Sequence, residues 1–305
     1  MSFNLTLATG RLVICVTDRR LSSPDGRRIV TERSNKLTVF RCRDAHGLIT
    51  YNGVGQDFEG ATPSDWLANL TALPDQMLDA AVEAIRFDAD RRLEAVRARG
   101  VDVRHSFVLS GFRRGTPFIQ MISNYESLGT EGALPVAEAR LTVSGTSLST
   151  STTAGTPFAL VATGAHPRRL AHLQRIADRV RDGAAPGELR KMMVKVVKDI
   201  AYGQGRRGSV GTSVQSAMVG PVSGFETSGH IPGGTTLQEM PNFLAPGMLF
   251  KDIYIDVSGS PDPRGRYDLV RRKARIAETS CKTCGNPVPE GYRRCGICDE
   301  VVHPT

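Results

Sequence analysis

The chain of 305 residues contains no apolar run of transmembrane length, and Asn4 and Arg11 interrupt its first apolar stretch. These interruptions exclude both a membrane span and a signal peptide. Because no leader stands behind Met1, we expect a cytoplasmic protein. Aromatic residues make up only 6% of the chain, a low content for a surface on which nucleic-acid bases stack.

Several familiar catalytic motifs are also missing. The sequence has no G-x-S-x-G elbow, no H-E-x-x-H and no Walker loop, and its six histidines form no pair at ligand spacing. The glycines of GVGQDFEG, residues 53–60, are spaced wrongly for a dinucleotide-binding loop. We therefore do not expect an ordinary serine triad or zincin chemistry.

The formal net charge of +8 allows contact with nucleic acid or with an acidic partner. Much of the excess lies in short clusters such as Arg113-Arg114, Arg206-Arg207 and 271–273. Such clusters are typical of solvated faces and linkers, so nucleic-acid binding is the weakest of our hypotheses. Hydrophobic residues make up 40% of the 305 residues, enough for one large folded domain and a second, small unit.

Strands and helices are predicted in blocks. The predicted strands lie at residues 5–8, 12–16, 36–42, 47–53, 105–112, 116–124, 158–164, 208–220 and 250–259. Four helices are predicted: one from Thr62-Pro63, one from Asp75 to about Arg97, and two with apolar stripes over 170–180 and 189–200. The Ser/Thr/Gly-rich stretch 142–156 is predicted to be a loop. Strand blocks separated by helix pairs favour antiparallel sheets with helical layers packed against them.

The first two strands are predicted to form a hairpin around Thr9-Gly10. A two-residue loop at Thr9-Gly10 would place Ser2 opposite Thr17, whereas a three-residue loop ending at Arg11 would place it opposite Asp18. Either register brings Asp18 within one residue of the chain start.

The segments MSFNLTLATGRLVICVTDRRLS, NKLTVF and GLITYNGVGQD together resemble the opening of proteasome β-type subunits and their bacterial relatives, including the Anbu group. The later segments FALVATGAHPRRL and GSVGTSVQSAMV resemble further landmarks of that family. By the order of its elements, the resemblance covers most of residues 2 to about 220. It implies an α+β fold, the four-layer αββα sandwich of N-terminal-nucleophile (Ntn) hydrolases, and assembly into homo-oligomeric rings.

The resemblance also implies a catalytic site. Ser2 falls where the family has its nucleophilic threonine, Asp18 and Lys36 fall at the family's aspartate and lysine, and Gly53 matches the glycine whose N–H faces the oxyanion. Supporting residues of the family fall at Thr163 and Ser209. In such a site the α-amine of the first residue takes the proton of the hydroxyl, so activity requires the loss of Met1. Serine is small enough for methionine aminopeptidase to act before it.

The tail carries a metal-binding pattern. CKTCGNPVPEGYRRCGIC places Cys281, Cys284, Cys295 and Cys298 as two C-x2-C knuckles ten residues apart. Four thiolates suit one structural, tetrahedral Zn²⁺ and leave no ligand position for a catalytic water. A redox or disulfide role is the alternative. Cys15 and Cys42, in apolar strands, are predicted to be inert core residues.

These observations predict an Ntn hydrolase domain over 1–257, a basic linker over 258–279 and a zinc ribbon over 280–305. The leading hypothesis is a proteasome-like peptidase or amidohydrolase that acts on peptides or proteins. The rival is an inactive domain of the same fold, whose zinc ribbon recruits a protein or nucleic-acid partner. Arg206 favours the rival, because it stands three residues before Ser209, where the family carries an aspartate.

Overall fold

Most strands pair into two large sheets in a computed structural model of the chain. It describes residues 2–23, 28–68, 70, 76–101, 103–128, 137–148, 157–164, 171–205, 208–221, 225–229, 237–245, 248–250, 254–256, 278–280 and 287–289. The first sheet is antiparallel, with strands in the order β10 (Phe158–Gly164), β1 (Phe3–Thr9), β2 (Val13–Asp18), β11 (Val214–Val219) and β12 (Phe225–Gly229).

The second sheet is mixed. Its strands run in the order β15 (Met248–Phe250), β14 (Asn242–Ala245), β5 (Leu37–Arg41), β6 (Ala45–Gly53), β7 (His105–Arg113), β8 (Thr116–Ser123) and β9 (Thr142–Ser147). Only the pairing of β14 with β5 is parallel. Three small pairs complete the described strands: β3 (Leu21–Ser22) with β4 (Ile29–Thr31), β13 (Leu237–Glu239) with β16 (Tyr254–Asp256), and β17 (Glu278–Ser280) with β18 (Pro287–Pro289).

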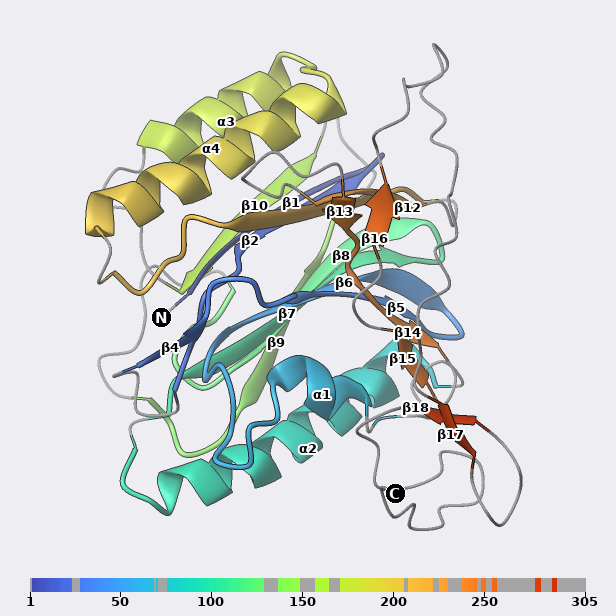
Figure 1. Cartoon of the computed structure of the whole chain (residues 1–305). Coiled ribbons are helices and arrows are strands. Elements are labelled where there is room, and N and C mark those ends of the chain that lie inside the picture. Colours follow the sequence, from blue (N-terminus) through green and yellow to red (C-terminus); the bar gives the residue numbers. More distant parts are fainter. Residues whose placement is uncertain are drawn as a thin grey trace.

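The helices lie on the outer faces of the two sheets (Figure 1). The first sheet is covered by α3 (Ala171–Arg181) and α4 (Pro186–Gln204), and the second by α1 (Pro63–Ala68) and α2 (Leu78–Arg97). Three apolar cores follow, one under each helix pair and one between the sheets. The α+β class predicted from the sequence is confirmed.

Local chemistry explains the helix starts. Thr62 and Asp65 form a reciprocal cap: the Thr62 amide donates to the Asp65 carboxylate (2.8 Å), and the Asp65 amide donates to the Thr62 hydroxyl (3.3 Å). Pro186 begins α4 at a position where its missing N–H costs nothing. The apolar stripes of α3 and α4 bury Ile176 and Met193 against the first sheet.

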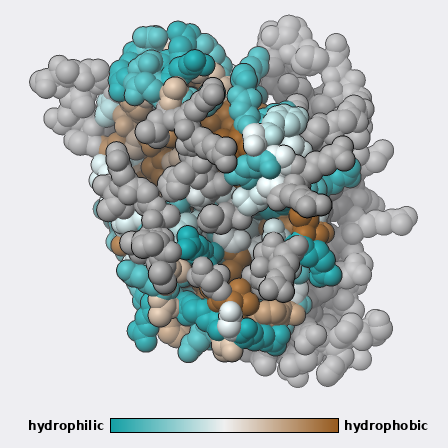
Figure 2. All heavy atoms as spheres, turned by 90° about the vertical axis from the view of Figure 1, so that its left-hand side faces the viewer, coloured by the Kyte–Doolittle hydropathy of each residue, from teal (hydrophilic) through white to brown (hydrophobic). Residues whose placement is uncertain are grey.

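The outward surfaces of these helices are polar. Figure 2 shows the end of the molecule at which the chain begins, with hydrophilic residues gathered at the top and bottom, where the helical layers lie, and hydrophobic residues visible between them. No helix among the described residues is long and apolar enough to cross a membrane.

The structure corrects both predicted registers of the first hairpin. Its loop is Gly10-Arg11, because Thr9 is still paired: its amide donates to the Leu12 carbonyl (2.8 Å), and its hydroxyl accepts from the Leu12 amide (3.1 Å). Asn4 therefore pairs with Thr17, and the same register carried on places Asp18 opposite Phe3 rather than Ser2. A threonine that can cap its own turn lengthens the strand by one residue, which the dipeptide signal did not reveal.

Two further predictions were wrong in their boundaries. Part of the predicted loop 142–156 is the edge strand β9, whose largely exposed, polar residues pair with β8. An edge strand has one solvated face and one free edge, so it needs little apolar sequence. The second helix begins at Leu78 and not at Asp75, with Met77 as its N-cap residue.

Candidate active site

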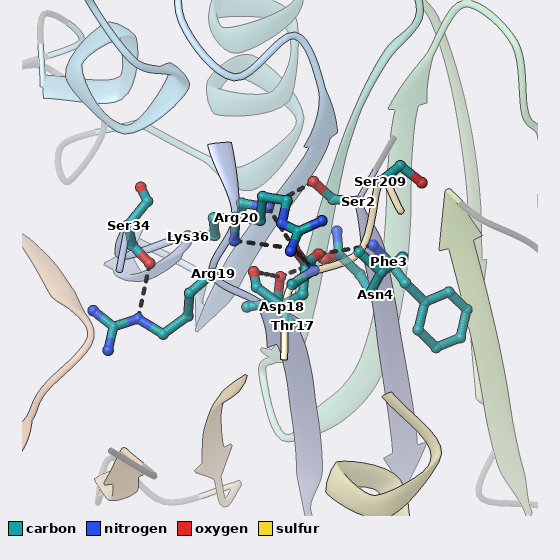
Figure 3. A network of polar contacts seen from close by, with 12 residues as sticks. Ser2, Phe3, Asn4, Thr17, Asp18, Arg19, Arg20, Ser34, Lys36 and Ser209 are labelled. Carbon is teal, nitrogen blue, oxygen red and sulfur yellow. Dashed lines mark hydrogen bonds and ion pairs between the residues drawn. The ribbon is translucent and has the colours of Figure 1, made fainter. Parts of the chain in front are cut away.

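Three polar side chains meet where the first strand begins (Figure 3). Ser2 stands directly before β1, Asp18 ends β2, and Lys36 stands directly before β5 in the other sheet. The Lys36 ammonium donates to the Ser2 hydroxyl oxygen at 2.6 Å and to the Asp18 carboxylate at 3.3 Å. Asp18 and Lys36 are fully buried and Ser2 is 7% exposed, so water screens these interactions weakly.

Backbone amides fix the carboxylate of Asp18. Its Oδ1 accepts from the Phe3 amide (2.9 Å), and its Oδ2 accepts from the amides of Arg20 (3.0 Å) and Gly211 (3.1 Å). Together with Lys36 these make four donors, which satisfy a buried carboxylate and hold it in one orientation. The aspartate thereby joins the first strand, the second strand and the segment before β11.

Burial lowers the pKa of Lys36, because the ammonium is removed from water, and the charge of Asp18 opposes this effect. The guanidinium of Arg20 lowers the pKa of Lys36 further, and Glu32 raises it. The Lys36 ammonium therefore loses a proton more readily than that of a lysine in water. Its shortest described contact, at 2.6 Å, is with the Ser2 hydroxyl oxygen.

Arg20 ties together the segments around this site. Its guanidinium is bonded to Glu32 (Nε to Oε1, 2.9 Å) and donates to the carbonyl of Gly208. Gly211 packs so closely here that a Cβ on it would lie 2.8 Å from the Cβ of Arg20. Arg206, which stands where the family carries an aspartate, lies outside the described residues.

Ser209, one of the two supporting residues that the resemblance implies, is hydrogen-bonded to the end of α4. Its hydroxyl donates to the side-chain oxygen of Gln204 at the end of α4 (3.2 Å), and its amide donates to the same oxygen (2.9 Å). Ser209 lies two residues before Gly211 and so stays beside the site, but its described hydrogen bonds turn it toward the helix.

Thr163 and Gly53 lie next to the site without a described hydrogen bond to Ser2. The Thr163 hydroxyl accepts from the Asn52 side chain (2.8 Å). Gly53 follows Asn52 at the end of β6, with φ +98°, and a Cβ there would lie 1.9 Å from the carbonyl oxygen of Arg104. Backbone conformation and close packing therefore already require glycine at this position.

The sequence did not reveal a second set of polar residues behind Ser2. Asn52 accepts from the hydroxyls of Ser106 (2.8 Å) and Tyr125, and Glu126 accepts from the Gly164 amide (2.9 Å). Asn52 is a polar residue at an inward position of the mostly apolar strand β6, and this departure from the pattern could have indicated it. Nothing in the sequence around Glu126 indicates that it contacts β10.

The described residues hold no group of three or more His, Cys, Asp or Glu side chains that could bind a metal. The predicted zinc ligands Cys281, Cys284, Cys295 and Cys298 lie outside the described residues. Cys15 and Cys42 are buried free thiols, and burial raises their pKa to about 11 and about 12, which makes both poor nucleophiles at neutral pH.

The fold and the site describe an α+β protein whose second residue lies beside a buried lysine–aspartate pair. No family model and no curated protein matches the chain. Among solved structures, it is similar to the Anbu (Gly-1) mutant from Hyphomicrobium sp. strain MC1, with 16% identity, a TM-score of 0.45 and coverage of 74% of this chain and 86% of that chain. It is also similar to Anbu (ancestral beta-subunit) from Yersinia bercovieri, with 13% identity, a TM-score of 0.42 and coverage of 72% and 82%.

Proposed function

We propose that the chain is an Ntn hydrolase of the proteasome-like αββα sandwich type, which cleaves peptide or amide bonds with Ser2 as its nucleophile. The observation that supports this most strongly is the 2.6 Å contact between the Lys36 ammonium and the Ser2 hydroxyl, with Asp18 bonded to the same ammonium. A hydroxyl is a weak nucleophile until a neighbouring base or cation lowers the cost of removing its proton.

In the proposed reaction the Ser2 oxygen attacks the substrate carbonyl carbon, and its proton passes to the α-amine of Ser2. That amine has an ordinary pKa of about 7.7–8.0, so part of it is neutral at physiological pH. The Gly53 N–H would receive the developing negative charge on the carbonyl oxygen, and Thr163 and Ser209 would support the site. The C–N bond then breaks, the leaving nitrogen takes the proton, and water hydrolyses the ester on Ser2.

Lys36 tunes this reaction. Its positive charge stabilises the alkoxide that forms on Ser2, and Asp18 keeps it in place. Because burial also lowers the pKa of Lys36, the lysine is a second candidate for the base. Blocking the α-amine distinguishes the two: a chain that keeps Met1 should be inactive if the amine is the base, and active if Lys36 is.

The test compares wild type with Ser2→Ala and Lys36→Ala. Each protein is first weighed intact, to establish that Met1 is absent, and is then treated with a fluorophosphonate and with a panel of peptide amides. An activated serine displaces fluoride from the probe, so wild type should gain one phosphonyl group and turn over peptides, while both variants should not. Ser147→Ala removes an exposed hydroxyl from β9 and should behave as wild type. Equal labelling of all four proteins would reject the assignment.

The inactive, partner-binding domain remains the second candidate, because Ser209 bonds to Gln204 and Arg206 replaces an acid. A purified chain that retains Met1 and reacts with neither probe would favour it.

We also propose that the tail binds one Zn²⁺ through its four cysteines and that the chain forms a homo-oligomeric ring. The cysteine spacing supports the first proposal and the family resemblance the second. Metal analysis of the full chain should find one zinc per chain, and paired Cys281→Ser and Cys284→Ser substitutions should remove it. Sedimentation should find a closed oligomer; a monomer at all concentrations would reject the ring.

A further inference from the structure

Tyr125 and Glu126, which follow β8, are linked by hydrogen bonds to the end of β10. Tyr125 reaches Thr163 through Asn52, and Glu126 contacts Gly164 directly. The hydroxyl of Tyr125 donates to Asn52, which in turn donates to the Thr163 hydroxyl (2.8 Å). The carboxylate of Glu126 accepts the Gly164 amide directly (2.9 Å). Glu126 is 8% exposed, although no step of the proposed reaction uses it.

Gly164 lies directly against the backbone of the proposed nucleophile. Its φ is +89°, and a Cβ on it would lie 2.0 Å from the carbonyl oxygen of Ser2. Strands β1 and β10 pair here, with Gly164 opposite Phe3. A shift of Gly164 of even a few tenths of an ångström must therefore move the segment that carries the Ser2 hydroxyl, because no space separates them.

We propose that Glu126 is a positioning residue for Ser2: its ionised carboxylate holds Gly164 in place, and Gly164 holds the first residues of β1 at the Lys36 ammonium. The effect on the reaction rate rests on the proposed function, whereas the contacts that join Glu126 to Ser2 through Gly164 do not depend on it. A charged acceptor makes a hydrogen bond about twice as strong as a neutral one, so the hold weakens when Glu126 takes up a proton.

The burial of Glu126 makes this change fall near neutral pH. Burial raises the pKa of Glu126 to about 7, against the lowering effect of the Gly164 amide and the Tyr125 side chain. Tyr125 stays neutral, because burial and the neighbouring Glu126 raise its own pKa well above 10, and Arg104 acts on Tyr125 with a smaller opposing effect. Among the described residues that act on this pair, Glu126 is thus the group that changes charge between pH 6 and 8.

The experiment follows two readouts from pH 5.5 to 8.5, in protein labelled with ¹⁵N-glycine and ¹³C-serine. The first is the NMR shifts of the Gly164 amide and the Ser2 Cβ, and the second is the rate of fluorophosphonate labelling at Ser2. Glu126→Gln keeps an acceptor oxygen but cannot ionise, Glu126→Asp keeps the charge on a shorter side chain, and Glu94→Gln makes the same change at an exposed position of α2.

In wild type and Glu94→Gln, the Gly164 amide and the Ser2 Cβ should share a titration with a midpoint near 7, in addition to the later change that the Ser2 α-amine causes at the Cβ. Above this midpoint, labelling should be roughly fivefold faster than in Glu126→Gln at the same pH, since a charged hydrogen bond is about twice as strong as a neutral one. Glu126→Gln should lose the shared titration and keep only the rise that the α-amine causes, and Glu126→Asp should recover part of the difference. Titration of Gly164 without Ser2 overturns the proposal, as does a labelling profile of Glu126→Gln that matches wild type. If wild type takes up no probe at all, the proposed function fails, and the two NMR shifts still decide whether Glu126 positions Ser2.

Discussion

The space between the two sheets has a polar end and an apolar end, although the same strands line both. At the end that holds Ser2, one row across the first sheet consists of Thr163, Asn4, Thr17 and Gln215. Four residues further along the strands, the equivalent row consists of Ala159, Ala8, Val13 and Val219. The strand period of two places both rows on the inner face, so the difference lies in chemistry and not in geometry.

The facing sheet repeats the pattern. Its row at the Ser2 end consists of Asn52, Ser106 and Ser123, and the inter-sheet core further along includes Leu48, Phe112 and Ile119. Apolar contacts are non-directional, so the apolar end stabilises the fold without specifying orientation. Hydrogen bonds are directional, so the polar end fixes the positions of atoms. The comparison indicates that both ends stabilise the fold but that only the polar end fixes the geometry of the site, so substitutions at the apolar end should lower stability and leave the site intact.

Asp18→Ala should have the largest effect on stability. It leaves the buried ammonium of Lys36 without its partner and three backbone amides without their acceptor, so we expect a loss of about 3–5 kcal/mol in the free energy of unfolding by urea. The double variant Asp18→Ala, Lys36→Met removes both charges and should regain part of this loss. A single variant within 1 kcal/mol of wild type would show that the polar end does not hold the sheets.

Leu48→Ala tests the apolar end. Leu48 is fully buried between the sheets, so its truncation should cost about 3 kcal/mol, within the range for buried leucines. Because the site lies at the other end, the rate of probe labelling at Ser2 in the folded protein should stay at the wild-type value. A labelling rate that falls with stability would mean that the two ends are not separable.

Thr17 and Thr6 lie in neighbouring rows of the first sheet, so the same substitution at both positions compares the two rows. Thr17 donates to Asn4 at 2.5 Å, whereas the hydroxyl of Thr6, one row further in, has a 3.7 Å contact with the sulfur of Cys15. Thr17→Val should therefore cost about 1–3 kcal/mol, because it leaves a buried acceptor without its donor. Thr6→Val should change the unfolding free energy far less. Equal costs for the two substitutions would remove the distinction between the rows.

The smallest effect at neutral pH concerns His105, whose ring lies on the other side of the second sheet, against Trp66 and Phe107. Complete burial lowers the pKa of His105 from 6.5 to about 3, so the unfolded chain takes up a proton on acidification before the folded chain does. Stability is therefore lost as the pH falls below 6.5, by about 2 kcal/mol at pH 5 relative to pH 7.

Urea unfolding at both pH values measures this loss, and His105→Phe should remove it without a change at pH 7. If the variant is as acid-sensitive as wild type, the burial of His105 does not cause the loss of stability at low pH.

The sequence predicted those parts of the protein that depend on periodicity. Stripes on α3 and α4, and apolar runs such as that of β6, follow from spacing alone, and the resemblance placed Ser2, Asp18 and Lys36 where the structure brings them together. Registers were not predictable in the same way, because the side chain of Thr9 decided the length of the first turn.

Contacts between distant segments were beyond prediction. Glu126 and Gly164 lie 38 positions apart, and no local pattern joins an acid after one strand to the amide of a glycine in another. The tail shows the opposite case: its cysteine spacing predicts a metal site, although the four cysteines lie outside the described residues.

The acceptor that Asp18 offers to the Gly211 amide joins positions 193 residues apart. During synthesis the Ser2 hydroxyl is therefore among the first groups to leave the ribosome, long before the late segment that contains Gly211. A contact between positions so far apart can form only after most of the chain has been synthesised. If the protein cuts amide bonds, this order of synthesis is itself a safeguard, since an unfinished chain carries the reactive group without the means to use it.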